Sequence, residues 1–167
     1  MPIKRSSRPE IDALIADLGA DRPITREAAI ARLTVIGARA VDRLTTVLES
    51  PASSSIRVAA LRALEGIGGS RALSASLLAL DDPDEVVATA AVGSVRASLR
   101  GVRGAEIAGR LAQIALDGTR QPAVRVAAIG TLSDLEQGTL APLWKALASD
   151  GNRTIREAAK AARPKDQ

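Results

Sequence analysis

One short phrase recurs five times along this chain, and its spacing limits the fold more than any other feature. The copies read TREAAIARL, IRVAALRAL, VATAAVGSV, VRVAAIGTL and IREAAKAAR. Their second residues stand at positions 26, 57, 88, 125 and 156, so successive copies lie 31, 31, 37 and 31 residues apart. A period of about 30 to 45 residues is typical of stacked helix pairs. Such arrays usually present a binding surface rather than enclose a reaction site.

Each copy also has the periodicity of a helix with one apolar face. In the second copy, small and apolar residues recur at i, i+3, i+4, i+7, i+8 and i+11, which places them on one side of a helix. A second segment with its own apolar row, such as Val41, Leu44 and Leu48, lies between consecutive copies. We therefore expect a front helix at each copy and a rear helix between copies.

The expected fold is all-α, an α-solenoid (superhelix) of about five helix pairs and about ten helices. We expect one repeat domain over residues 10–162, a basic tail at 1–9 and a polar tail at 163–167. The front helices are expected near 23–36, 54–66, 84–98, 121–135 and 151–162, and the rear helices near 10–19, 39–49, 70–80, 105–116 and 139–149. The step of 37 predicts an insertion of about six residues at 99–104.

The recurring phrase resembles the HEAT repeat, in particular the short bacterial type known as the PBS-lyase-like HEAT repeat. The second copy carries that resemblance closely, through Ile56, Arg57, Ala59, Ala60, Leu64, Ile67 and Gly68. The opening Asp-Pro of the family phrase matches Asp82 and Pro83. The resemblance covers about residues 10–162, and it implies a HEAT-like solenoid whose inner face is built from the rear helices.

By this resemblance, one arginine in each repeat pairs with an acid at a neighbouring turn and forms an internal ladder. The positions that carry over are Arg26, Arg57, Arg125 and Arg156. Ala88 interrupts the ladder in the third copy, and Lys160 replaces an apolar stacking residue in the last, where we interpret it as a polar cap.

Composition removes most catalytic and metal chemistry. The chain has no Cys and no His, so thiolate nucleophiles, thiolate metal sites and the commonest general base are absent. We therefore expect a protein that is not an enzyme and has no cofactor or metal. No apolar run approaches the length of a membrane span, so we expect no membrane association and a cytoplasmic location.

The main functional hypothesis is a scaffold that binds another protein on the rear-helix face, as a monomer or homodimer. Candidate contact residues lie off the apolar rows of the rear helices: Asp12, Ile15, Asp42, Thr45, Arg110, Gln113, Trp144 and Lys145. Trp144 is the only aromatic residue, and it would make a strong interface anchor if exposed. Packing against the last helix is the equal alternative.

A second hypothesis is nucleic-acid binding by the stretch Arg96–Arg125. Residues 95–125 hold six basic and two acidic residues, and the basic patch is Arg96, Arg100, Arg103 and Arg110. The first three would share one face of a continuing helix. Against this, no aromatic residue lies nearby to stack on bases, and the net charge of +4 is modest.

A third hypothesis comes from the resemblance alone, since some relatives are bilin lyases or lyase-accessory proteins. Other relatives hydroxylate protein lysines with His-containing metal motifs, which a His-free chain does not supply. Helical-repeat DNA glycosylases use several aromatics, whereas this chain has one.

Overall fold

The computed structural model describes residues 7–135 and 140–162, and all regular structure in that part of the chain is helical. The rear helices are α1 (Arg8–Asp17), α3 (Val41–Glu49), α5 (Gly69–Leu78), α7 (Gly104–Leu116) and α9 (Ala141–Leu147). The front helices are α2 (Pro23–Ile36), α4 (Ser54–Ile67), α6 (Glu85–Val95), α8 (Pro122–Leu132) and α10 (Arg153–Ala162). Front and rear helices alternate as predicted, so the all-α helical-repeat fold is confirmed.

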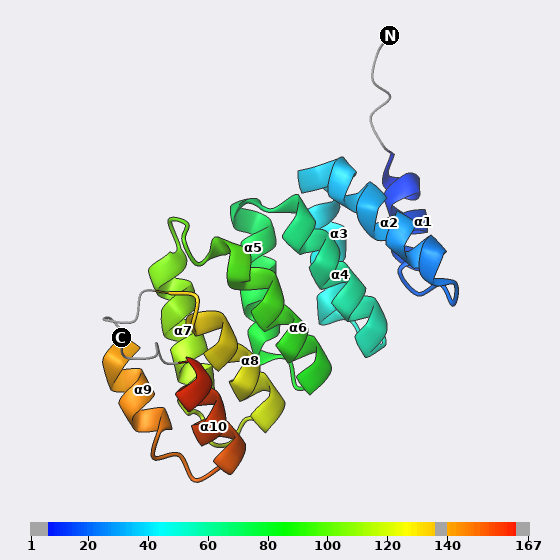
Figure 1. Ribbon diagram of the computed structural model, residues 1–167. Helices are drawn as coiled ribbons and strands as arrows, with labels where there is room; N and C mark the ends of the chain where they lie inside the picture. Colours follow the sequence, from blue (N-terminus) through cyan, green and yellow to red (C-terminus); the bar gives the residue numbers. More distant parts are fainter. Residues whose placement is uncertain (1–6, 136–139, 163–167) are drawn as a thin grey trace. The chain divides into compact units, whose positions relative to one another are not determined.

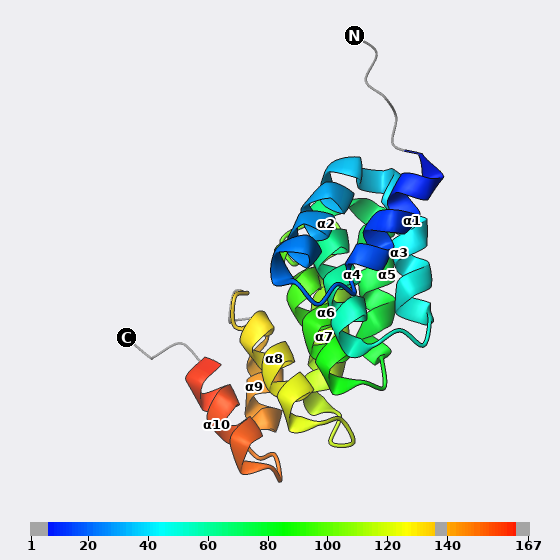
Figure 2. The ribbon, with the colours of Figure 1, turned by 90° about the vertical axis from the view of Figure 1, so that its right-hand side faces the viewer.

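The chain divides into two compact units, residues 1–94 and 95–167. In the first unit the rear helices α1, α3 and α5 follow one another along one side, and the front helices α2, α4 and α6 follow one another along the other (Figures 1 and 2). In the second unit α8 packs against α7 and α10, and α9 packs against α7 and α10. The expected single domain over residues 10–162 stays a prediction.

The core of the first unit consists of the apolar rows read from the sequence. Leu18, Leu33, Leu44 and Leu64 are 0–1% exposed, and each buried leucine contributes about 1.5–3 kcal/mol. Alanines on α4 let α2 approach closely, because a small side chain shortens the distance between packed helices. The two helices approach closely at Gly66, where an added Cβ would lie 2.7 Å from the Thr34 hydroxyl oxygen.

Glycine ends two of the front helices. Gly37 follows α2 with a φ of 71°, and Gly68 follows α4 with a φ of 66°. Residues with a side chain rarely adopt a positive φ, whereas glycine adopts it without strain. Each glycine therefore turns the chain from a front helix towards the next rear helix.

The third repeat departs from the expected helix boundaries. α6 ends at Val95, and a short 3₁₀ helix, η3 (Arg96–Ser98), replaces the end of the helix expected over 84–98. The insertion then forms a tight turn before α7. An added Cβ at Gly104 would lie 2.0 Å from the carbonyl oxygen of Leu99, so only glycine fits the first position of α7.

The arginine ladder is present at two of its four positions. The guanidinium of Arg57 contacts the carboxylates of Asp82 and Asp84, and Arg125 pairs with Asp150. Arg57 and Arg125 each lie 25 residues before the aspartate of the following repeat. Arg125 also donates from Nε to the carbonyl oxygen of Ala115 at 2.9 Å, which fixes the orientation of its guanidinium.

For the other two ladder arginines, the hydrogen bonds within residues 7–135 and 140–162 go to backbone carbonyls. Position 51, which lies 25 residues after Arg26, is a proline, and Arg26 donates instead to the carbonyl oxygen of Ala20 at 3.3 Å. Arg156 donates to the carbonyl oxygens of Asp150 and Gly151 at 2.6 and 3.0 Å. Both guanidinium groups thus satisfy donors on backbone carbonyls, and the charge of Arg156 also helps to lower the pKa of Asp150.

Candidate functional site

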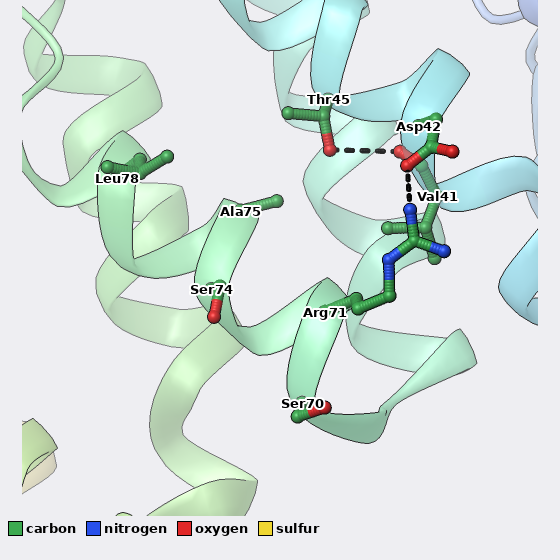
Figure 3. A pocket seen from close by; sticks show the side chains of 8 residues that line it. All are labelled: Val41, Asp42, Thr45, Ser70, Arg71, Ser74, Ala75 and Leu78. Carbon is green, nitrogen blue, oxygen red and sulfur yellow. Dashed lines mark hydrogen bonds and ion pairs between the residues drawn. The ribbon is translucent and has the colours of Figure 1, made fainter.

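A groove runs between the rear helices α3 and α5 of the first unit (Figure 3). Its volume is about 290 Å³, and it is open to the surface. It is lined by Val41, Asp42, Thr45, Ser70, Arg71, Ser74, Ala75 and Leu78. Two of the predicted contact residues, Asp42 and Thr45, therefore lie together on one wall.

The walls follow from helical spacing. Asp42 and Thr45 are one turn apart on α3, while Ser70, Ser74 and Leu78 recur every four residues on α5. Val41 and Ala75 are 3% and 4% exposed. The groove thus has a buried apolar floor between two walls that carry polar groups.

Charged, hydroxyl and apolar groups meet on these walls. Asp42 and Arg71 form an exposed ion pair across the groove, drawn in Figure 3. The Thr45 hydroxyl donates to the carbonyl oxygen of Val41 at 2.9 Å, so its oxygen can still accept a hydrogen bond. Leu78 is 67% exposed, which is high for a leucine. This combination suits a peptide segment that offers both an apolar side chain and polar groups.

A second cross-helix ion pair lies on the same side of the first unit. Arg43 on α3 donates from Nε to Asp12 on α1 at 2.7 Å. Successive rear helices are thus joined by Asp12–Arg43 and Asp42–Arg71. Both arginines were missed in the sequence analysis, although each follows its aspartate by about one repeat period. Leu78 was missed as well, although a leucine that lies off the apolar row of its helix is expected to be exposed.

The remaining rear-face candidates are spread over three helices. Ile15 on α1 is half-buried against the core, so it is not the free contact residue that we expected. Gln113 on α7 and Lys145 on α9 are exposed. Arg110 is half-buried beside Glu106. The groove includes none of these four, and their contact with a partner stays a prediction.

Trp144 does not have the exposed position that an interface anchor needs. Its side chain is 3% exposed on α9, a helix that packs against both α7 and α10. Burial of Trp144 therefore contradicts the exposed anchor that we expected. The contact of α9 with the last helix, α10, agrees with the alternative of packing against that helix.

The basic patch of the second unit is largely engaged within the chain. Arg96 pairs with Asp134 at 2.5 Å, and Arg100 donates to the carbonyl oxygen of Asp134 at 3.3 Å. Arg103 forms a two-pronged ion pair with Glu106 at 2.7 and 2.8 Å. Because η3 interrupts the helix, the expected shared helical face of the first three arginines is absent.

These contacts also shift the pKa of charged groups in and beside the basic patch. The hydrogen bond from Arg103 lowers the pKa of Glu106, helped by the charges of Arg103 and Arg110. The hydrogen bond to Asp134 raises the pKa of Arg96. A small cavity of about 200 Å³ lies beside Arg96, Arg100 and Asp134. A phosphate at this place would compete with carboxylates that already neutralise the arginines.

Within residues 7–135 and 140–162, no group of three or more acidic, His or Cys side chains is arranged so that it could hold a metal ion. In the same ranges every helix is too short or too polar to span a lipid bilayer.

Comparison with solved structures places this architecture among helical-repeat proteins. The chain is similar to a chain of the CpcE–CpcF complex of phycocyanin lyase from Nostoc sp. PCC7120, with 24% identity and a TM-score of 0.68, over 93% of this chain and 99% of that chain. It also matches a designed armadillo repeat protein in complex with the peptide (KR)4, with 21% identity and a TM-score of 0.48, over 92% of this chain and 80% of that chain. No family model and no curated protein matches the chain. The likeness to the phycocyanin lyase chain, over nearly the whole of both chains, agrees with the all-α helical-repeat fold.

Proposed function

We propose that the chain is a non-enzymatic scaffold that binds a partner protein at the groove between α3 and α5. The observation that carries the proposal is an exposed leucine, Leu78, next to an exposed ion pair and several hydroxyl groups in one open groove. An open groove with an apolar floor and polar walls is a common form of interaction site. The partner is held through an apolar anchor in contact with Leu78, and hydrogen bonds to Asp42 and Thr45 set its register.

Substitution at the groove tests this function. Leu78→Glu removes the apolar contact and adds a charge, so a partner captured by the wild-type chain from its native cell is lost. Val86→Glu is the matched control, because Val86 is also exposed (55%) and lies on α6, outside the groove. A partner that is retained by the Leu78→Glu chain, or lost equally from the control, refutes the groove as its binding site.

A second candidate is a subunit that takes part in bilin attachment. It is supported by the match to the phycocyanin lyase chain, which extends over nearly the whole of both chains. Incubation with a bilin and a phycobiliprotein apoprotein tests it, with the visible absorbance as the readout. A chain that leaves the absorbance unchanged, alone and with a partner captured through the groove, has no such role.

Nucleic-acid binding is the weaker alternative. The side chains of Arg96 and Arg103 already contact carboxylates, so phosphate binding must first break those pairs. Retention on duplex DNA that falls steeply with salt and ignores sequence would support it. Equal retention after Arg100→Ala would exclude this patch as the site.

A further inference from the structure

The outward face of α2 carries an exposed apolar row. Ile24, Ala28, Ala31 and Val35 are spaced by four, three and four residues, so they lie on one side of the helix. All four are exposed, Ile24 at 72% and Val35 at 88%. Among the described helices α2 contacts α1, α4 and the short helix η1 (Gly37–Ala40), and these contacts leave the row exposed.

The corresponding row on α4 shows what such a surface does in this fold. Ala59 lies 31 residues after Ala28 and is 3% exposed, and Gly66 lies 31 residues after Val35 and faces Thr34 of α2. On α4, Ala59 is thus buried and Gly66 closely approaches α2, whereas Ser55, Arg62 and Gly66 are themselves exposed. The α2 row stands at the same phase of its repeat and has no described helix against it.

Two residues make α2 unsuited to an ordinary preceding repeat. Close stacking at Gly66 requires glycine, since a Cβ there would lie 2.7 Å from Thr34, whereas α2 has Val35 at that phase. Ala63 of α4 is fully buried, whereas Arg32 stands at the corresponding position of α2 and its side chain is 65% exposed. The occupant of the α2 row must therefore tolerate a bulky apolar residue and an adjacent cation.

The spacing of the row is that of a short coiled-coil seam. If Ile24 and Ala31 take d positions, Ala28 and Val35 take a positions, Glu27 falls at g and Arg32 at e. In a parallel pair of helices, a g residue faces the e residue five positions later on the other helix. Glu27 of one chain would then face Arg32 of the other, twice over, because the two-fold axis repeats the contact.

We propose that the α2 row, defined as Ile24, Ala28, Ala31 and Val35, binds the α2 row of a second copy of this chain in parallel. Charge selects this occupant and its direction. An antiparallel pairing would place Glu27 near Glu27 and Arg32 near Arg32, which is repulsive. The two charged side chains are 52% and 65% exposed, so each can add an intermolecular contact to its present partner, Arg62 or Glu10.

The contact is small, which sets the strength of the dimer. A helix of 14 residues is about 21 Å long, and two of its four seam residues are alanines. Stable interfaces usually bury about 800 Å² on each partner, more than such a seam offers. We therefore expect a reversible dimer that dissociates on dilution rather than an obligate one.

Sedimentation equilibrium of the full chain, from about 1 µM to about 1 mM, tests the proposal over the range of weak association. The wild-type chain is expected to pass from monomer to dimer. Glu27→Arg or Arg32→Glu alone places like charges together and weakens the dimer by about tenfold or more. The double substitution Glu27→Arg with Arg32→Glu restores attraction and returns the dissociation constant towards the wild-type value.

Two controls make the result specific to α2. Glu49→Arg changes the charge equally on the exposed surface of the rear helix α3 and should leave the dimer intact. Ile24→Asn with Val35→Asn should abolish the dimer, while circular dichroism confirms that helix content is kept. A monomer at every concentration, a double charge swap that stays dissociated, or a dimer that survives both asparagines would each overturn the proposal. The proposal would also be overturned if the chain stayed monomeric and a different helical protein bound to this row.

Discussion

Removal of the buried ion pair between α8 and the turn before α10 is the sharpest test of how the second unit is held together. The Arg125 and Asp150 side chains are 4% and 16% exposed. Arg125→Ala leaves Asp150 partly buried without its cation and leaves the carbonyl of Ala115 without its donor. Breaking a buried pair from one side costs about 3–5 kcal/mol, and the remaining solvent access of Asp150 places the expected loss near about 3 kcal/mol.

Thermal unfolding followed by circular dichroism measures this loss. For a chain of this length, about 3 kcal/mol corresponds to a fall in Tm of roughly 6–12 °C. Arg103→Ala is the matched control in the same unit, because it removes an exposed pair and should leave Tm near the wild-type value. In a double-mutant cycle with Asp150→Asn, the two losses should be non-additive by about 1–3 kcal/mol. Additive losses, or equal Tm values for Arg125→Ala and Arg103→Ala, would refute the argument.

Three further outcomes are expected. Trp144→Ala should lower the stability by about 3–5 kcal/mol in denaturant unfolding, because it opens a cavity, and binding that is lost while stability is unchanged would contradict its burial. On α7, Gly104→Ala should lower Tm because its Cβ would meet the carbonyl of Leu99, whereas Gly109→Ala, with open space around it, should raise stability by about 0.5–1 kcal/mol. Hydrogen bonds from Arg125 and from Ser54 lower the pKa of Asp150 and of Asp84 respectively, so their stabilisation is complete above the ordinary pKa of 3.8 and is lost as pH falls through the lower folded values. Asp150→Asn should therefore flatten the acid limb of a plot of Tm against pH, and an unchanged limb would exclude this carboxylate as a cause.

The repeats are readable from the sequence because their signal is local. α2 spans Pro23–Ile36, as predicted, since proline starts it, a row of apolar residues follows, and Gly37 ends it. The insertion in the third repeat was likewise located by its length. Its effect on α6 was not, because the close approach of Gly104 to the carbonyl oxygen of Leu99, which leaves no room for a Cβ, arises only once the turn is folded.

The sequence allowed a prediction of one wall of the groove but not of the other. Asp42 and Thr45 lie off the apolar row of their helix, which is visible in the sequence. Arg71 and Leu78 become neighbours of that wall only through the stacking of α5 on α3. Trp144 shows the same limit, because its place one position from the apolar row does not show whether the folded chain covers it, and it is 3% exposed.

The first unit is joined by ion pairs of two kinds, and this makes its response to ionic strength uneven. Asp12–Arg43 and Glu27–Arg62, which tie α1 and α2 to the next hairpin, have side chains that are 37–52% exposed. Arg57 and Asp82, which tie α4 to the turn before α6, are only 15% and 9% exposed. Added salt weakens attraction between solvated charges and hardly reaches a covered pair. Amide hydrogen exchange in α1 and α2 should therefore quicken as salt rises while that of α4 stays slow, so that the ionic surroundings set how readily the α1–α2 hairpin comes away from the rest of its unit.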